Sequence, residues 1–169
     1  MLDLLVLYTL NEYEKSGYQI NKEILKNFGS VMSPSSGSIH PVLNKLLKLK
    51  CINQRTILTD GGKKSNLYSL TKEGTKYFNL LFQKEFNFSA SDFRQQIYTR
   101  ILTISFANIE SKKIFFDYTL FKLNDFILDI ENRLHNEYLK YNVQQEVFFK
   151  FQINELKNLI DFIEKISNK

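Results

Sequence analysis

Hydrophobic residues in the first fifty positions recur at helical spacing in three separate stretches. Residues 2–10 are apolar at nearly every position, which predicts a short helix buried on most of its circumference. A second, amphipathic stretch covers residues 18–28 and ends at Gly29. A serine-rich turn precedes the third stretch, and we expect Pro41 in the first turn of that helix. Its apolar positions, expected to face inward, are Ile39, Val42, Leu43, Leu46, Leu47 and Leu49.

After Lys50 the hydrophobic pattern changes from that of a helix to that of strands. Residues 51–58 and 65–70 are short β-compatible runs. Asp60-Gly61-Gly62 between them is typical of a hairpin turn, because glycine readily adopts positive φ. Thr71 is placed to cap a further helix. Three helices followed by a hairpin predict a winged helix-turn-helix domain over residues 1–84.

The second half of the chain is free of strong helix breakers. All six glycines and both prolines precede residue 75, so residues 85–169 are expected to form long helices joined by short polar turns. The fold class is therefore mainly α with a small β-hairpin.

Apolar residues in this half recur mostly at alternating spacings of four and three, which is typical of a coiled-coil seam. We expect residues 85–169 to be a helical dimerisation domain; an internal helical bundle within one subunit is the alternative. The predicted dimerisation residues are Phe116, Leu120, Leu123, Ile127, Ile130, Leu134, Phe149, Ile153, Leu156, Ile160 and Ile163, and Tyr138 and Tyr141 continue the first stripe.

The net charge of +5 is confined to the first half of the chain. Residues 1–85 hold 12 Lys/Arg and 7 Asp/Glu, whereas residues 86–169 hold 11 of each. A basic excess concentrated in one region is typical of a surface that binds phosphates, and a solvated basic face is the alternative. Between Val31 and Thr71 the basic residues are Lys45, Lys48, Lys50, Arg55, Lys63 and Lys64, opposed only by Asp60.

Several classes of protein are disfavoured by the composition. One cysteine, Cys51, and two histidines without companions at ligand spacing predict neither a disulfide nor a metal site. No apolar run approaches the roughly 18 residues of a membrane span, and the start lacks the features of a signal peptide, so we expect a cytoplasmic protein. No nucleophile–base set or cofactor motif is present, and we expect neither catalysis nor a cofactor.

The third helix and the hairpin tip carry the side chains suited to bind DNA. Small hydroxyls at the helix start allow close approach of the backbone, and the helix N-terminus attracts phosphate. Asn44 and His40 are the expected base readers, and Lys45 and Lys48 the expected phosphate contacts. The predicted DNA-binding residues are Tyr18, Ser35, Ser36, Ser38, His40, Asn44, Lys45, Lys48, Lys63, Lys64 and Ser65.

Three motifs resemble the PadR family of regulators across residues 1–84. Residues 33–43, Ser-Pro-Ser-Ser-Gly-Ser-Ile-His-Pro-Val-Leu, are similar to its recognition-helix signature S-P-x-x-G-S-I-Y-P-x-L. Residues 16–20 resemble its H-G-Y-E-I motif, and residues 61–74 its wing and exit, G-G-R-x-x-x-Y-Y-x-L-T-x-x-G. Three features depart from the family: His40 replaces the usual tyrosine, Ser16 replaces a common histidine, and the chain has no tryptophan.

The resemblance implies a homodimer that binds a palindromic operator and represses a neighbouring gene, with some members released by small molecules. We expect sequence-specific binding to double-stranded DNA; the alternative is a winged-helix protein-interaction module without DNA binding. The abundant Phe and Tyr of the second half are expected to be core. If an effector exists, we expect an aromatic or apolar compound between the wing domain and the dimerisation helices.

Overall fold

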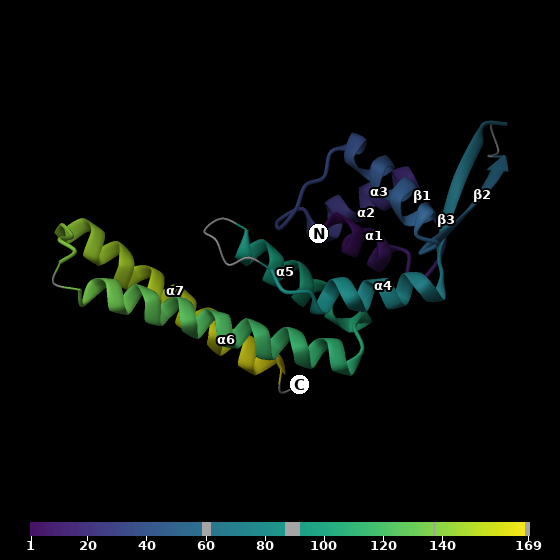
Figure 1. Cartoon of the computed structure of the whole chain (residues 1–169). Helices are drawn as coiled ribbons and strands as arrows, with labels where there is room; N and C mark the ends of the chain where they lie inside the picture. The colour runs from purple at the N-terminus through teal and green to yellow at the C-terminus, as the bar shows by residue number, and fades with distance from the viewer. Residues whose placement is uncertain (59–61, 87–91, 137, 168–169) are drawn as a thin grey trace. The chain divides into compact units, whose positions relative to one another are not determined.

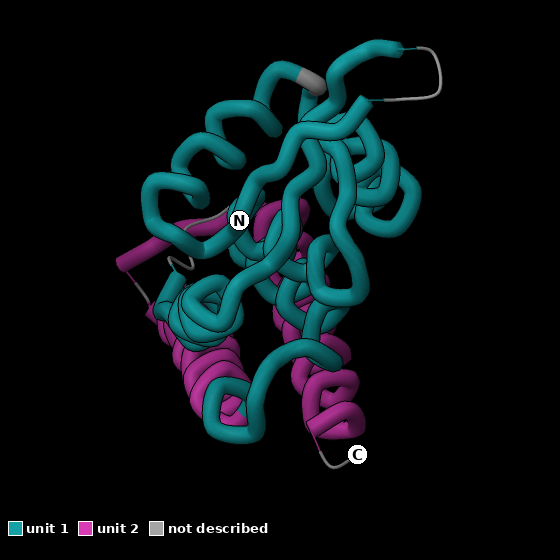
Figure 2. Tube along the Cα trace, turned by 90° about the vertical axis from the view of Figure 1, so that its right-hand side faces the viewer, with its two compact units in different colours: residues 1–112 teal, residues 113–169 magenta. Residues whose placement is uncertain are grey.

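The computed structural model describes residues 1–58, 62–86, 92–136 and 138–167, with the side chain of Ser36 left out. The chain divides into two compact units, residues 1–112 and residues 113–169 (Figure 2). The first unit contains the expected winged-helix region and continues past residue 84. The predicted domain boundary between residues 84 and 85 therefore stays a prediction. None of the described helices combines the length and apolar character needed to span a membrane.

The predicted order of helices and hairpin is confirmed in the first unit (Figure 1). Its elements to the end of the winged helix are α1 (Leu2–Thr9), β1 (Lys15–Ser16), α2 (Gly17–Phe28), α3 (Ser36–Lys48), β2 (Ile52–Leu58), β3 (Lys64–Leu70) and α4 (Lys72–Gln83). The antiparallel sheet has the order β1-β3-β2, and the register pairs Arg55 with Leu67 and Leu58 with Lys64. Two-residue β1 was not predicted, because so short a strand has no hydrophobic period of its own.

Helix α1 is the centre of the first unit's core. Leu4 to Leu7 are all buried, and α1 contacts α2, α3, α4 and α5. Polar groups near the C-terminal end of this buried helix have hydrogen-bond partners within the protein. The Thr9 hydroxyl donates to the Leu5 carbonyl oxygen at 2.7 Å. The Lys15 ammonium, itself buried, donates to the Thr9 carbonyl oxygen at the helix end and lies 3.2 Å from the Glu23 carboxylate. A buried lysine is tolerated here because both its charge and its donors are matched.

Two details of α3 differ from the sequence-based expectation. Ser35 is its N-cap in extended conformation, so the helix begins at Ser36 and Pro41 is its sixth residue rather than part of the first turn. The amide that Pro41 lacks would otherwise bond to the Gly37 carbonyl. Leu49 is 47% exposed instead of facing inward, because α3 ends at Lys48 and the chain reverses immediately afterwards.

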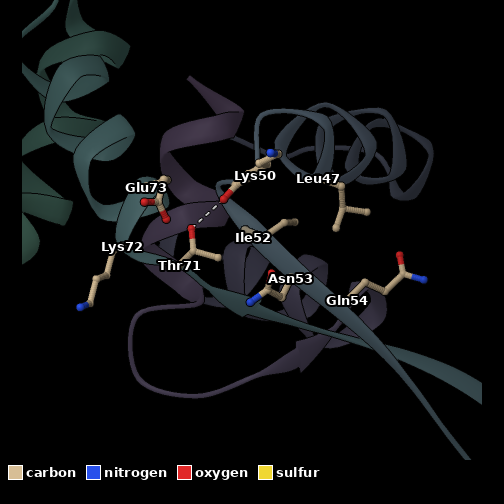
Figure 3. Close-up of a pocket in the computed structure, with 8 residues that line it drawn as sticks. All are labelled: Leu47, Lys50, Ile52, Asn53, Gln54, Thr71, Lys72 and Glu73. Atoms are coloured by element: carbon tan, nitrogen blue, oxygen red, sulfur yellow. Dashed lines mark hydrogen bonds between the residues drawn. The ribbon is translucent and has the colours of Figure 1, made fainter.

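The reversal after α3 places a lysine in the left-handed region of backbone conformation. Lys50 has φ of 56°, and its amide bonds to the Leu47 carbonyl at 2.9 Å while the Cys51 amide bonds to the Leu46 carbonyl at 2.9 Å. This pair of bonds is the Schellman motif, in which glycine is the usual residue because it has no Cβ. The Thr71 hydroxyl donates to the Lys50 carbonyl oxygen at 2.8 Å and ties the reversal to the start of α4 (Figure 3).

Helix α5 (Phe93–Thr103) is attached to α4 through one buried arginine. Arg100 is 5% exposed, and its five N–H donors make five hydrogen bonds. Three reach the carbonyls of Leu81, Phe82 and Lys84 at the end of α4, at 2.7–3.2 Å, and two reach Gln96. The guanidinium therefore caps α4, where the helix dipole favours a cation. A short 3₁₀ turn, η1 (Ile104–Phe106), follows α5.

The remaining helices, α6 (Ile109–Leu134) and α7 (Val143–Ser167), form an antiparallel hairpin (Figure 1). Helix α6 begins in the first unit, and the boundary between the units falls within it. An ion pair of 3.7 Å joins Glu131 on α6 to Lys157 on α7.

The apolar residues predicted to form the dimer seam are largely buried within the single chain. Seven of its eleven residues are buried and the other four are half-buried. These side chains are therefore removed from water without a second chain, as expected if the alternative, an internal helical bundle, holds for these positions. The expected continuation at Tyr138 lies beyond the end of α6 and is 96% exposed. Dimerisation itself stays a prediction.

Replacing Lys50 with glycine should stabilise the protein. A left-handed conformation costs a residue with a Cβ about 1–2 kcal/mol, and glycine's greater freedom in the unfolded chain offsets about half of that. We expect the free energy of unfolding to rise by about 0.5–1 kcal/mol in denaturant titrations. The control Lys48→Gly, at the last residue of α3, should instead lower it, because glycine is a poor helix former. A loss of stability in Lys50→Gly would contradict this account of the reversal.

Candidate nucleic-acid interface

One face of α3 is polar and exposed while the opposite face is buried. Ile39, Leu43 and Leu46 point into the core. His40, Asn44 and Lys48 follow one another at intervals of four residues and are exposed, so they lie along one line of the helix. The structure thus brings together three of the predicted base and phosphate contacts on a convex surface that a DNA groove can accommodate.

The N-terminus of α3 is open to solvent. Ser35 is exposed and makes no side-chain cap hydrogen bond, and the Ser38 hydroxyl donates instead to the Ser35 carbonyl oxygen at 2.7 Å. A Cβ built on Gly37 would meet only the Ser35 hydroxyl, at 3.9 Å, so the backbone here is accessible. The Ser38 amide donates to the Ser35 carbonyl oxygen at 3.0 Å, which leaves the two amides before it, those of Ser36 and Gly37, as donors at the helix N-terminus that suit a phosphate.

The start of α2 lies beside this surface. A Cβ on Gly17 would be 3.4 Å from the Leu43 side chain and 3.8 Å from the His40 ring, so the backbone of α2 passes close to α3. Ser16 caps α2 through a reciprocal pair of bonds with Gln19. Tyr18 is the next residue after Gly17 and is 75% exposed, so its phenol is open to solvent.

The wing adds two cations to the candidate interface. Strands β2 and β3 project from the helices as a hairpin (Figure 1), and Lys63 and Lys64 are exposed near its tip. Gly62 has φ of 72°, as expected for a hairpin glycine. Ser65 is half-buried. Residues 59–61, which complete the predicted turn, lie outside the described residues.

Lys45, a predicted phosphate contact, is exposed but forms an ion pair within the protein. Its ammonium forms an ion pair with Asp3 on α1, and the hydrogen bond from Lys45 to this carboxylate raises the lysine's pKa above its ordinary value of 10.5. No local pattern could predict this contact, because the two residues are 42 positions apart. Lys45 is therefore already neutralised in the free protein.

Arg55 on the wing is likewise matched by an acid. Its guanidinium makes two hydrogen bonds to the Glu14 carboxylate, one of them 2.8 Å long, and links β2 to the segment before β1. The hydrogen bond from Arg55 lowers the pKa of Glu14 below 4.5; desolvation partly opposes this shift, and the arginine's charge adds a smaller lowering effect. Within the described chain, Lys48, Lys50, Lys63 and Lys64 have no such acidic partner.

A hollow lies at the base of the wing, behind the Lys50 reversal (Figure 3). It is lined by Leu47, Lys50, Ile52, Asn53, Gln54, Thr71, Lys72 and Glu73. The lining is mostly polar and joins the end of α3 to the start of α4. Within the part of the chain described here, no three His, Cys, Asp or Glu side chains gather as metal ligands would.

Residues 6–80 match a known family, described as the transcriptional regulator PadR-like family. Among solved structures, the chain is similar to Bacillus subtilis PadR in complex with operator DNA, at 20% identity and a TM-score of 0.49, covering 99% of this chain and 98% of that one. It is also similar to smu.1604c from Streptococcus mutans UA159, at 24% identity and a TM-score of 0.44, with the same coverage. A comparison with curated proteins finds no match.

Removing the guanidinium of Arg55 should release the Glu14 carboxyl. In Arg55→Gln we expect the pKa of Glu14 to rise toward 4.5, its ordinary value, measured by NMR titration of the carboxyl carbon. Because the folded pKa lies below the unfolded one, the bridge contributes to stability above pH 4.5, and that contribution disappears as pH falls through the folded pKa. Arg55→Lys keeps the charge and should give an intermediate value. An unchanged Glu14 titration in Arg55→Gln would show that the bridge is absent in solution.

Proposed function

We propose that residues 6–80, which match the PadR-like family of transcriptional regulators, are a DNA-binding domain and that the chain is a homodimeric repressor that binds a palindromic operator in duplex DNA. The observation that carries the proposal is the exposed line of His40, Asn44 and Lys48 on α3, which starts from an uncapped helix N-terminus. A helix entering the major groove needs polar side chains on such a face.

Each part of the interface has a distinct role in this proposal. The Asn44 amide has the donor and acceptor needed to read the edge of an adenine, and His40 contacts a neighbouring base. The free amides at the start of α3 bind a phosphate, which fixes the helix in the groove without reading sequence. Lys48, Lys63 and Lys64 neutralise phosphates on either side. Lys45 contributes only if DNA displaces Asp3.

Exposed apolar residues of the helical hairpin support the homodimer. They lie on the outer faces of both helices and comprise Phe121 and Leu128 on α6, and Val147, Phe148, Phe151 and Phe162 on α7. Large aromatic side chains gathered on an exposed surface are typical of protein interfaces. We propose that a second copy covers these residues rather than the inner stripe. In the bound dimer the two α3 helices should then lie about 34 Å apart, or a multiple of it.

An effector and the absence of catalysis complete the proposal. An aromatic or apolar effector would release the operator by favouring a dimer with a different separation of the α3 helices. The chain's residues serve binding rather than catalysis.

Substitutions in the wing and in α3 should affect DNA binding differently. Lys63→Ala/Lys64→Ala removes two phosphate contacts, so affinity should fall for all sequences and the slope of log K against log salt should flatten by about 2. Asn44→Ala should instead weaken operator binding by about 5–100-fold and leave non-specific binding nearly unchanged. Fluorescence anisotropy with operator and scrambled duplexes at several salt concentrations measures both. Binding that does not depend on salt in the wild-type protein would favour a protein-interaction module.

The oligomeric state tests the exposed apolar surface. Replacing Phe148 and Phe151 with Ser should remove two aromatic contacts from the interface and weaken the dimer by at least tenfold, as measured by analytical ultracentrifugation. The matched control Leu25→Ser changes an exposed apolar residue on α2 and should leave the dimer intact. A dimer unaffected by the double substitution would place the interface elsewhere.

A further inference from the structure

The connection between α2 and α3 is held by a residue far along the chain. The Gln95 side-chain amide on α5 donates to the Val31 carbonyl oxygen at 2.8 Å. On its other side the connection is anchored to α2, because the amides of Val31 and Met32 bond to the Phe28 carbonyl at 2.9 and 2.7 Å. Val31 is therefore fixed between the end of α2 and the side of α5.

The position of Val31 affects the start of α3. Four residues separate Val31 from Ser36, the first residue of α3, and Ser35 provides no side-chain cap. The Ser38 amide and hydroxyl bond to the Ser35 carbonyl oxygen at 3.0 and 2.7 Å, so these bonds define the first turn but do not attach it to the rest of the unit. The α3 N-terminus, with Gly37 and the free amides, takes its place from the connection that precedes it.

Helix α5 is a firm support for this contact. Arg100, five residues after Gln95, fixes α5 to the end of α4 with its hydrogen bonds to three main-chain carbonyls. Phe106, in the turn that follows α5, packs against Phe78 of α4 with ring centroids 4.7 Å apart. The Gln95 amide thus projects from an anchored helix, and its bond to Val31 restrains the connection.

We propose that Gln95 is a positioning residue for DNA recognition: it holds the α2–α3 connection so that the α3 N-terminus presents a fixed geometry to the operator. The inference rests on the proposed function, since it assigns α3 as the recognition helix. Gln95 itself does not contact DNA. Its loss should therefore reduce the preference for the operator without removing any phosphate contact.

The test uses the full chain with Gln95→Met, which keeps the side-chain size and removes the donor. Operator affinity should fall by about three- to tenfold, as expected for one hydrogen bond. Affinity for scrambled DNA and the salt slope should stay unchanged, because the lysines are untouched. Hydrogen exchange of the backbone amides of residues 32, 33 and 35–38 should become faster. Gln95→Glu, which turns an acceptor toward the Val31 carbonyl, should have a larger effect.

Gln144→Met on the exposed face of α7 makes the same chemical change away from the connection and should behave as wild type. Equal losses of operator and scrambled binding in Gln95→Met would indicate general destabilisation and overturn the proposal. So would unchanged exchange at residues 32, 33 and 35–38. If the wild-type protein binds no DNA, the proposed function fails; the exchange measurement then still decides whether Gln95 positions α3.

Discussion

The first unit depends on burying a helix that has almost no exposed face. Helix α1 is surrounded by α2, α3, α4 and α5, and Leu4 to Leu7 are removed from water together. Burial of each such side chain contributes about 1.5–3 kcal/mol relative to exposure. The same burial requires that the ends of α1 find polar partners inside the protein. The arrangement of the other helices follows from covering α1 on every side.

Two buried cations complete that arrangement. Lys15 satisfies the last carbonyl of α1, and Arg100 satisfies three carbonyls at the end of α4. A charge in the interior is costly unless it is paired or fully hydrogen-bonded. Both cations meet this condition at helix C-termini, where the dipole also favours them. Arg100 additionally holds α5 in place, and α5 reaches the connection before α3 through Gln95.

The basic side chains of the first unit fall into two groups: those that form ion pairs within the protein and those that have no acidic partner among the described residues. Lys45 and Arg55 are engaged by Asp3 and Glu14, which lie at the beginning of the chain. The lysines at positions 48, 50, 63 and 64 have no acidic partner among the described residues. The candidate interface therefore consists of the line along α3 and the wing, whereas net charge alone suggested a broader patch.

Local patterns in the sequence determined the helices and strands, and tertiary contacts determined which of their side chains are buried, paired or available for binding. Helical spacing, the Asp-Gly-Gly turn and the Thr71 cap correctly predicted α1 to α4 and the hairpin, since each depends on neighbouring residues. The residue that covers an apolar stripe or pairs with a charge lies far away in sequence. Only the structure therefore showed the burial of the α6 and α7 stripes, the Lys45–Asp3 pair and the Gln95–Val31 bond.

Gly74 combines both kinds of information: the sequence placed it in a motif, and the structure supplies the reason. A Cβ there would lie 2.1 Å from the Cys51 carbonyl oxygen.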